Sequence, residues 1–296
     1  MRVTVLEAIQ KSAEFLAKKN VESPRLQTEL LLAQLLKMPR MKLYLNFDRA
    51  LTATETDALR ELVKRRGLRE PLQHIVGSTA FCGCEIGVNR HALVPRPETE
   101  LLAELGWQWL GEHSTSNFQN AGPTALDFGT GTGCIAIALA VKCPNAKITA
   151  LDVSAAALAL AKENAAKNKV AERIEFLQSD GFAAVANAVP ALRFDLIISN
   201  PPYIPSAEIE TLEPEVRDFD PRAALDGGAD GLDFYRLLAA PAQAFLKPGG
   251  KIMLEFGDGQ ADAIKKIFAD ENWIVEAVKA DYSQRARILV AQASRL

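Results

Sequence analysis

Hydrophobic residues recur at helical spacing within the first 70 residues. In the stretch "RLQTELLLAQLL" four leucines lie close to one face of a helix, namely Leu26, Leu30, Leu31 and Leu35. Ser23 and Pro24 precede this stretch and predict a helix start, with the serine as N-cap and the proline in the first turn. Thr52 and Glu55 have the spacing of a capping box ahead of another helix. The pattern predicts a small helical bundle.

From about residue 124 onward, short apolar strands alternate with helices. The strand "ALDFG" precedes the helical stretch "CIAIALAVK", and "KITALD" precedes "SAAALALAKENAAKN". Further short strands are predicted at "IEFLQSD", "FDLIISN", "KIMLEF" and "ILVAQA". Such alternation is typical of a mostly parallel sheet that helices cover on both faces.

Residues 80–95 connect these two regions. The stretch "FCGCEIGVNRHALVP" alternates and contains two glycines, which predicts a hairpin-like connector. Pro97 then opens a new helix, and Glu98 and Glu100 suit the positive end of its dipole. We therefore predict three parts, which are a helical domain at 1–78, a linker at 79–96 and an α/β domain at 97–296.

The amino-acid composition is typical of a folded protein and argues against a protein whose main role is to bind nucleic acid. Hydrophobic residues make up 48% of the 296 positions and charged residues 24%, and the formal net charge is −3. Residues 1–80 hold 14 lysines and arginines against 9 aspartates and glutamates, a net charge of +5, whereas the remainder holds 20 against 28, a net charge of −8. This asymmetry indicates either two regions with different partners or ordinary surface variation.

The cysteines predict neither a metal site nor a disulfide framework. Cys82 and Cys84 are one residue apart, and no second pair or nearby histidine completes a tetrahedral set. We expect reduced thiols in a cytoplasmic protein. Glu7 and Lys11 interrupt the first apolar stretch, so no signal peptide is expected, and no apolar run is long enough to cross a bilayer.

A glycine-rich loop follows the strand that begins the α/β domain. Its residues are candidates for binding a cofactor: Gly129, Thr130, Gly131, Thr132 and Gly133. Glycine there permits positive φ and close approach of a ligand, although a turn without a ligand is the plainer interpretation. A dinucleotide fingerprint would place a third glycine where Cys134 stands, which disfavours NAD and flavin.

Acidic residues end the next two strands. Asp152 can accept hydrogen bonds from both ribose hydroxyls of an adenosine. Asp180 and Gly181 could meet the adenine amino group, or Asp180 could be a helix N-cap. Together with the glycine loop and the Asn-Pro-Pro-Tyr stretch at 200–203, Asp152 favours S-adenosylmethionine over NAD.

The stretch "LIISNPPYIP" ends a buried strand in Asn200, Pro201, Pro202 and Tyr203. The prolines could simply terminate the strand. Alternatively, the Asn200 side-chain oxygen and the Pro201 carbonyl accept both hydrogens of an amide or aromatic NH₂ group and orient it, while the Tyr203 ring forms a flat wall. Transfer of a methyl group to that nitrogen needs no strong general base, because the proton can leave after methylation.

These motifs resemble those of bacterial release factor glutamine methyltransferases. The resemblance rests on "PLQHIVG", "VPRPETE", "DFGTGTG", "SNPPYIP", "ALDGGADGLDFYR" and "KPGGKIMLEFG", which occur in that order, and on the N-terminal "SPRLQTELLLAQLL". It implies a class I S-adenosylmethionine-dependent methyltransferase, with a Rossmann-like, seven-stranded, mostly parallel sheet and a small N-terminal helical bundle. Two departures are Gly181, where some relatives carry a bulky residue, and Phe256, where an aliphatic residue is frequent.

The resemblance also implies a substrate, which is the glutamine of the Gly-Gly-Gln loop in class-1 peptide chain release factors. It assigns cofactor contacts to Gly129–Gly133, Asp152 and Asn200, and substrate contacts to Asn200–Tyr203. We expect a cytoplasmic monomer that binds neither nucleic acid directly nor a membrane, with residues 1–78 docking the substrate. The alternative is an adenine-N6 methyltransferase on DNA or RNA, and a third class is an inactive adapter.

A further expectation concerns the acidic loop at 206–230. Only Arg217 and Arg222 oppose its eight acidic residues within the loop. It is either a lid over the substrate or a solvated loop.

Overall fold

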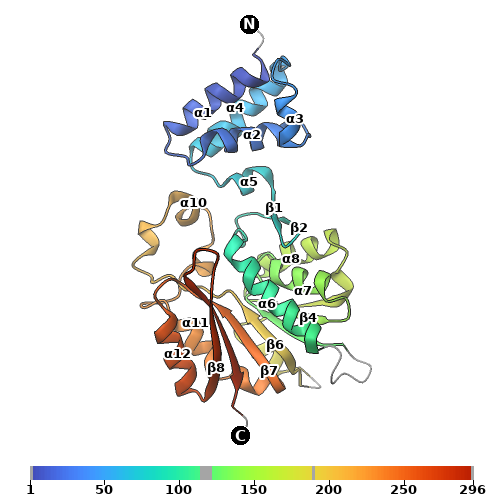
Figure 1. Cartoon of the computed structure of the whole chain (residues 1–296), viewed down its shortest axis with the longest axis vertical. Coiled ribbons are helices and arrows are strands. Elements are labelled where there is room, and N and C mark those ends of the chain that lie inside the picture. The colour runs from blue at the N-terminus through green and yellow to red at the C-terminus, as the bar shows by residue number, and fades with distance from the viewer. Residues whose placement is uncertain (1–2, 114–121, 189–190, 295–296) are drawn as a thin grey trace. The chain divides into compact units, whose positions relative to one another are not determined.

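The chain forms two compact units. The computed structural model describes residues 3–113, 122–188 and 191–294 (Figure 1). One unit comprises residues 1–78 and 212–219, and the other comprises residues 79–211 and 220–296. No helix among the described residues has both the length and the apolar character that a membrane span requires.

The first unit is helical. Its helices are α1 (Val5–Ala17), α2 (Pro24–Leu35), α3 (Arg40–Tyr44), α4 (Ala53–Gly67), α5 (Leu72–Val76) and the short α10 (Pro214–Arg217). The predicted capping box is confirmed, because the Thr52 hydroxyl accepts from the Glu55 N–H and the Glu55 carboxylate accepts from the Thr52 N–H. The predicted helix start is also confirmed, with Ser23 at the N-cap position and Pro24 in the first turn, but Ser23 does not cap the helix through its side chain. Ser23 has a φ of 46° and its side chain makes no capping hydrogen bond.

The buried face of α2 differs from the predicted leucine face. Leu31 and Leu32 are fully buried, whereas Leu26 is exposed. Glu29 is also buried, at 1% exposure, because Arg25 and Arg40 pair with its carboxylate. Since α2 packs against both α1 and α4, its buried stripe is wider than one row of leucines and is displaced from it.

Segment 212–219 packs with the first unit through ion pairs. The Glu215 carboxylate lies 2.6 Å from Arg66 Nη2 and 2.7 Å from Arg69 Nε, and Glu213 lies 2.6 Å from Arg69 Nη2. Burial raises the pKa of Glu215, but hydrogen bonds from Arg69 and Arg66 outweigh it, so the net shift is downward. Arginines from outside the acidic loop, Arg66 and Arg69, therefore hold this segment of it.

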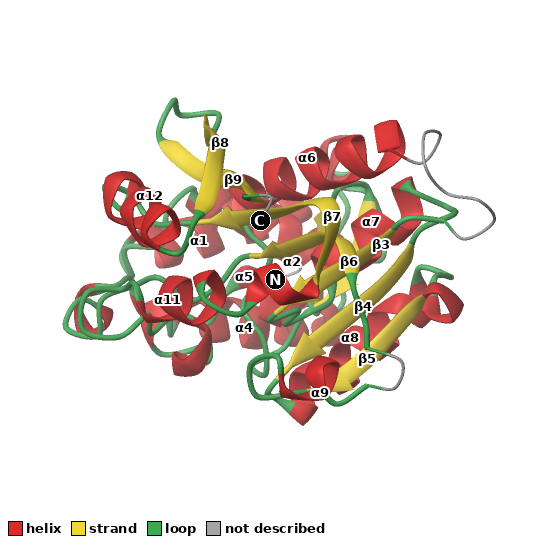
Figure 2. Ribbon diagram, turned by 90° about the horizontal axis from the view of Figure 1, so that it is seen from below, coloured by secondary structure: helices red, strands yellow, loops and turns green. Residues whose placement is uncertain are grey.

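The second unit is built on a seven-stranded sheet with the order β5-β4-β3-β6-β7-β9-β8 (Figure 2). The strands are β3 (Thr124–Phe128), β4 (Lys147–Asp152), β5 (Ile174–Gln178), β6 (Phe194–Ser199), β7 (Leu246–Glu255), β8 (Trp273–Ala280) and β9 (Ala286–Ala293). Strands β3 to β7 pair in parallel, and β9 pairs antiparallel with both β7 and β8. A separate two-stranded sheet joins β1 (Ser78–Phe81) and β2 (Cys84–Gly87).

Helices cover both faces of this sheet. They are α6 (Pro97–His113), α7 (Cys134–Lys142), α8 (Ala155–Lys167), α9 (Ala183–Ala186), α11 (Asp233–Ala239) and α12 (Ala261–Asp270). Alternate strand residues serve the two faces. Leu196 and Ile198 pack in one core with α6 and α7, while Ile197 packs in the other with α11 and α12. Strands buried on both sides explain the continuous apolar runs in the sequence.

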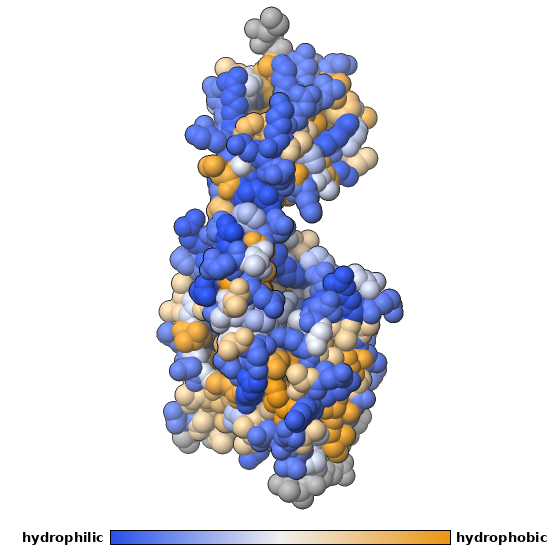
Figure 3. Space-filling view, turned by 90° about the vertical axis from the view of Figure 1, so that its left-hand side faces the viewer, coloured by the Kyte–Doolittle hydropathy of each residue, from blue (hydrophilic) through white to orange (hydrophobic). Residues whose placement is uncertain are grey.

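Strand β8 was absent from the predicted strands. It contains Glu276 and Lys279 and lies at the edge of the sheet, where one face is largely exposed. Because polar residues interrupt its apolar positions, β8 lacks the continuous hydrophobic run of the other strands. Its pairing with β9 identifies it as a strand. On the molecular face in Figure 3, hydrophilic residues predominate and hydrophobic residues form smaller groups among them.

Candidate functional site

The candidate site lies at the carboxyl ends of the parallel strands, where the chain order reverses. The chain runs from β3 to β4 and β5, then returns to β6 on the other side of β3. Open α/β sheets bind ligands at such a switch point. A cavity of about 380 Å³ opens there, within the usual size range for small-molecule sites.

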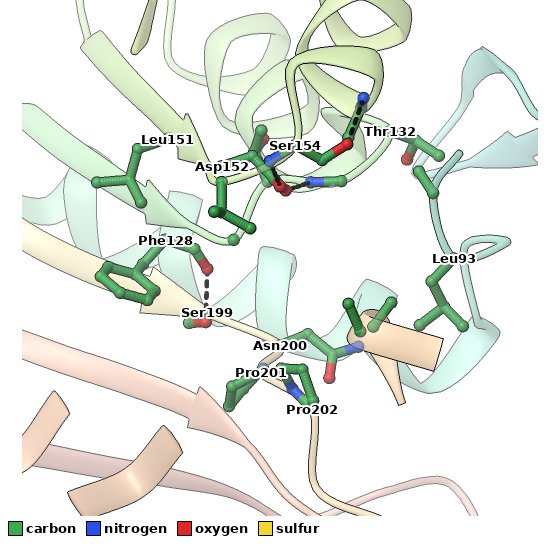
Figure 4. Close-up of a pocket in the computed structure, with 18 of the residues that line it drawn as sticks. Leu93, Phe128, Thr132, Leu151, Asp152, Ser154, Ser199, Asn200, Pro201 and Pro202 are labelled. Carbon is green, nitrogen blue, oxygen red and sulfur yellow. Dashed lines mark hydrogen bonds between the residues drawn. The ribbon is translucent and has the colours of Figure 1, made fainter. Parts of the chain in front are cut away.

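The cavity brings together most of the residues that the sequence predicted. Those in its lining are Gly129, Thr130, Gly131, Thr132, Asp152, Asp180, Gly181, Asn200, Pro201 and Pro202. Gly133 and Tyr203 do not belong to the lining. Asp152 and Asn200 lie on opposite walls (Figure 4).

Backbone hydrogen bonds shape the glycine loop. The N–H groups of Gly129 and Thr130 both donate to the Leu151 carbonyl at 2.9 Å. The Gly131 N–H donates to Asp152 Oδ2 at 2.9 Å. Gly133 begins helix α7 with a φ of 80°, and a Cβ there would lie 3.0 Å from Ala161 Cβ of α8. Glycine is needed at Gly133 for both its backbone conformation and this close helix approach.

Asp127 organises the loop from beneath and was not among the predicted site residues. Its Oδ2 accepts from the Thr130 hydroxyl at 2.6 Å and from the Ala136 N–H at 3.0 Å. The residue is fully buried, and Oδ1 has no hydrogen-bond partner in the described part of the chain. Burial raises the pKa of Asp127 to about 7. The sequence signal was a carboxylate inside an apolar strand, immediately before the glycine loop.

Asp152 presents a carboxylate that the backbone already orients. Its Oδ1 accepts from the Ser154 N–H at 2.9 Å, while Oδ2 accepts from Gly131. Each oxygen has a second acceptor position. Asp152 can therefore take two hydroxyl donors from the cavity side.

Asp180 and Gly181 form the wall after β5. Asp180 is exposed and lines the cavity. The alternative interpretation of Asp180 as a helix N-cap is wrong, because Ser179 Oγ accepts the Ala184 N–H at 3.0 Å at the start of α9. Gly181 has a φ of 56° and contributes no side chain.

Asn200 and Pro201 provide two acceptors at the end of β6. The Asn200 Nδ2 group donates to Thr99 Oγ1 at 3.0 Å. Among the described residues, none donates a hydrogen bond to Asn200 Oδ1 or to the Pro201 carbonyl. The preceding Ser199 hydroxyl donates to the Phe128 carbonyl at 2.6 Å and so ties the end of β6 to the end of β3 (Figure 4).

Tyr203 has a different environment from the one predicted. Its ring is half-buried and packs against the core on the α11 and α12 face, and its carbonyl accepts from Gln260 Nε2 at 2.9 Å. Burial raises the pKa of the Tyr203 hydroxyl. The ring therefore supports the loop from outside the cavity lining.

The first turn of α6 and the residue before this helix contribute side chains that sequence reasoning missed. Arg96 and Thr99 line the cavity. The Arg96 Nη2 group lies 2.7 Å from Oδ2 of the buried Asp220, and Oδ1 of Asp220 accepts from the Val94 N–H at 3.4 Å. The motif "VPRPETE" thus starts helix α6 and also supplies Arg96 and Thr99 to the cavity lining.

No cluster of three or more histidine, cysteine or acidic side chains suited to a metal occurs in the described ranges. The arrangement offers instead a glycine loop held by backbone hydrogen bonds, a carboxylate for hydroxyl groups and two acceptors for an NH₂ group. This set suits the transfer of a group to a nitrogen.

Comparisons with known proteins agree with this geometry. Family models match the PrmC N-terminal domain over residues 7–77 and the methyltransferase small domain over residues 110–213. The release factor glutamine methyltransferase of Geobacter sulfurreducens is 43% identical over 266 residues, which cover 90% of this chain and 88% of that protein. The enzyme of the same name from Chlorobaculum tepidum is 40% identical and covers 94% and 95%.

A solved structure supports the fold independently. The human methyltransferase 10 domain containing protein matches with a TM-score of 0.50 and 14% identity, over 72% of this chain and 90% of that chain. The predicted fold class, a methyltransferase sheet of seven mostly parallel strands with a small N-terminal helical bundle, is confirmed. The chain belongs to the family of release factor glutamine methyltransferases.

Proposed function

We propose that this protein transfers a methyl group from S-adenosylmethionine to the side-chain amide nitrogen, N5, of the glutamine in the Gly-Gly-Gln motif of class-1 peptide chain release factors, and so modulates translation termination. The observation that carries the proposal is the pair of unengaged acceptors, Asn200 Oδ1 and the Pro201 carbonyl, in one cavity with the glycine loop and Asp152.

The residues present fit S-adenosylmethionine. The carboxylate of Asp152 suits the ribose hydroxyls, and the loop at 129–133 allows close approach of the rest of the molecule. Asp180 and Gly181 provide the wall for adenine. When bound, S-adenosylmethionine supplies an electrophilic methyl group on a positively charged sulfur.

The chain's own residues then act on the substrate amide. An amide nitrogen is a poor nucleophile because its lone pair is delocalised into the carbonyl. Asn200 and Pro201 accept its two hydrogens, fix its orientation and stabilise the positive charge that develops on nitrogen. Pro201 and Pro202 have restricted φ, which holds the Pro201 carbonyl in place. The excess proton leaves to water after methylation.

We assign substrate docking to residues 1–78 and catalysis to residues 97–296, with residues 79–96 as the linker. The first unit carries the positive charge excess and exposes large apolar side chains, among them Leu45, Leu68 and Met41. We further propose that the protein acts as a cytoplasmic monomer, without direct contact to nucleic acid or membranes.

The cofactor assignment is tested at Asp152. Replacing it in Asp152→Ala should weaken the binding of S-adenosylmethionine by roughly 1.5–3 kcal/mol, the scale of hydrogen bonds to a charged group. Calorimetry on the folded variant measures this. Unchanged affinity would contradict the ribose role.

The substrate assignment is tested with labelled S-adenosylmethionine and four acceptors. These are an intact release factor, the same factor with its Gly-Gly-Gln glutamine changed to alanine, duplex DNA and single-stranded DNA. Methyl transfer to the first acceptor alone supports the proposal. Transfer to DNA adenine, with none to the release factor, would show that the pocket serves adenine, whose exocyclic NH₂ group presents the same two hydrogens.

A further inference from the structure

Two buried polar residues, Thr99 and Glu255, lie next to Asn200, and Glu255 is outside the cavity lining. Thr99, in the first turn of α6, accepts the Asn200 Nδ2 hydrogen at 3.0 Å and is 2% exposed. The Thr99 hydroxyl also lies close enough to the carboxyl group of Glu255 to lower the pKa of that group. Glu255 ends β7, where the register of β6 and β7 places it beside Asn200.

Glu255 is an unusual residue for this position. It is 1% exposed, and its Oε2 is buried without a hydrogen-bond partner among the residues that the structure describes. Burying a carboxylate is costly, and neither its packing nor an ion pair within 4.0 Å in the described part accounts for it. A role in ordering its neighbours does account for it.

The direction of these hydrogen bonds follows from the chemistry of each group. A carboxylate can only accept, so Thr99 must donate its single hydroxyl hydrogen to Glu255. The Thr99 oxygen is then left as an acceptor and takes a hydrogen from the amide of Asn200. A flipped Asn200 would place Oδ1 against the lone pairs of Thr99, with no hydrogen between them.

We propose that Glu255 and Thr99 are positioning residues that lock the side-chain amide of Asn200 in the orientation that leaves Oδ1 as an acceptor for the substrate NH₂ group. This inference rests on the proposed function, because a substrate NH₂ group requires an acceptor there. The ionised carboxylate of Glu255 sets the donor and acceptor roles of both Thr99 and Asn200. A protonated Glu255 could donate to Thr99, which would then donate to Oδ1 and permit the flipped amide.

Several charged or titratable groups face Glu255. Arg96 and Glu98 come from the start of α6, Arg287 from β9, Tyr203 from the loop after β6, and Tyr235 from α11. Burial raises the pKa of Glu255 to about 7, against the opposing effects of Thr99 and Arg287. The lock is therefore expected to weaken as the pH falls below about 7.

The first test compares Thr99→Val with Thr99→Ser. Valine keeps the shape and removes the hydroxyl, so turnover on the release factor should fall about 10- to 100-fold, the usual scale for losing a partner that orients an active-site group. The variant Thr99→Ser keeps the hydroxyl and should therefore keep most of the wild-type turnover. The loss of turnover in Thr99→Val should be much larger than any change in its affinity for S-adenosylmethionine. Thr149→Val makes the same change at a buried threonine of β4 outside the cavity and should keep full turnover.

The second test needs no substrate. With selectively ¹⁵N-labelled asparagine, the side-chain NH₂ signal of Asn200 should shift with a midpoint near pH 7 in the wild type. The titration should be lost in Glu255→Gln, which keeps the size of the side chain and removes its ionisation. Wild-type turnover in Thr99→Val, or a titration that persists in Glu255→Gln, would overturn the positioning role. Failure of the wild type to methylate a release factor would instead overturn the proposed function, and the spectroscopic test would still decide the orientation of Asn200.

Discussion

Asn200 and Asp152 face the same cavity but differ in the hydrogen bonds that their side chains already make within the protein. Each carboxylate oxygen of Asp152 holds one backbone N–H, which fixes the group and leaves room for one more donor per oxygen. Among the residues that the structure describes, Asn200 has a hydrogen-bond partner only at its Nδ2 group, which leaves its oxygen available as an acceptor. The first arrangement suits the steady binding of a cofactor, and the second suits an interaction that strengthens during reaction.

Replacing Asn200 separates these two roles. In Asn200→Ala, turnover should fall by about 10²- to 10³-fold, the scale for removing one preorganised group at a transition state. Cofactor affinity should largely remain, because Asp152 and the glycine loop are intact. Single-turnover rates and calorimetry measure the two quantities. Tyr203→Phe serves as the matched control and should be mild, since the ring lies outside the cavity lining. Equal losses in the two variants would contradict the acceptor role.

Asp127 predicts a pH dependence of stability. Burial raises its pKa to about 7, above the value of about 3.9 for an unfolded chain. Between these pH values the folded protein keeps a proton that the unfolded chain has lost. The carboxyl therefore stabilises the fold at low pH, and this contribution is lost as the pH rises through about 7.

The variant Asp127→Asn removes this titration. Urea unfolding at about pH 5 and pH 8 should show that the wild type loses more free energy of unfolding across this interval than the variant does. An equal change in the free energy of unfolding for the wild type and the variant would mean that Asp127 has the same pKa in the folded and unfolded states.

At the scale of elements, the glycine loop joins β3 to α7 and also sets the distance between α7 and α8. Asn164 of α8 donates to the Thr132 carbonyl at 2.9 Å and accepts from the Gly87 N–H at 2.7 Å. One buried side chain of α8 thus holds the loop and the strand β2 together. Close packing at Gly133 makes this connection possible.

Gly133→Ala should disturb this packing. An alanine at this position would have to adopt the positive φ of Gly133, and its Cβ would lie 3.0 Å from Ala161 Cβ. We therefore expect the free energy of unfolding to fall by about 1–3 kcal/mol and cofactor binding to weaken. Gly111→Ala is the control, because Gly111 lies in α6 with open space around its Cβ position, and alanine there should be neutral or stabilising. Unfolding experiments compare the two. A neutral Gly133→Ala would contradict the packing argument.

At the scale of the whole molecule, the chain passes between its two units three times. Segment 212–219 leaves the second unit shortly after Asn-Pro-Pro-Tyr and returns at Asp220, whose carboxylate binds Arg96 at the cavity. Within the first unit, Arg66 and Arg69 hold the segment by its glutamates. The acidic loop is thus fixed at defined points by residues far away in the sequence.

A truncated chain that starts at Ala80 tests the docking role of the first unit. It should still bind S-adenosylmethionine but methylate an intact release factor with kcat/KM lower by about tenfold or more, equivalent to about 1.4 kcal/mol of lost docking energy. Truncation also removes the partners of Glu213 and Glu215. The full-length variant Arg69→Ala therefore serves as the control for releasing segment 212–219 alone. Full activity of the truncated chain on the intact factor would refute the docking role.

The sequence alone determined the features that depend on local pattern. Short apolar runs identified β3 to β7 and β9, because strands buried on both faces need hydrophobic residues at every position. The order of the glycine loop, Asp152 and Asn200 on successive strands placed them at one edge, because parallel strands end on the same side. Capping at Thr52 was likewise readable, since it involves only neighbours in the chain.

Only the tertiary structure decided the features that depend on distant partners. Edge strand β8 is recognised through its pairing with β9. Ser23 stands at the N-cap of α2 in a left-handed conformation, and its side chain makes no capping hydrogen bond. The packing of Tyr203 away from the cavity depends on α11 and α12. Thr99 and Glu255 are 156 positions apart and meet behind Asn200 only because α6 and β7 fold against β6. Local pattern carries no information about such contacts, since the energy of a buried polar group depends on what the fold places beside it.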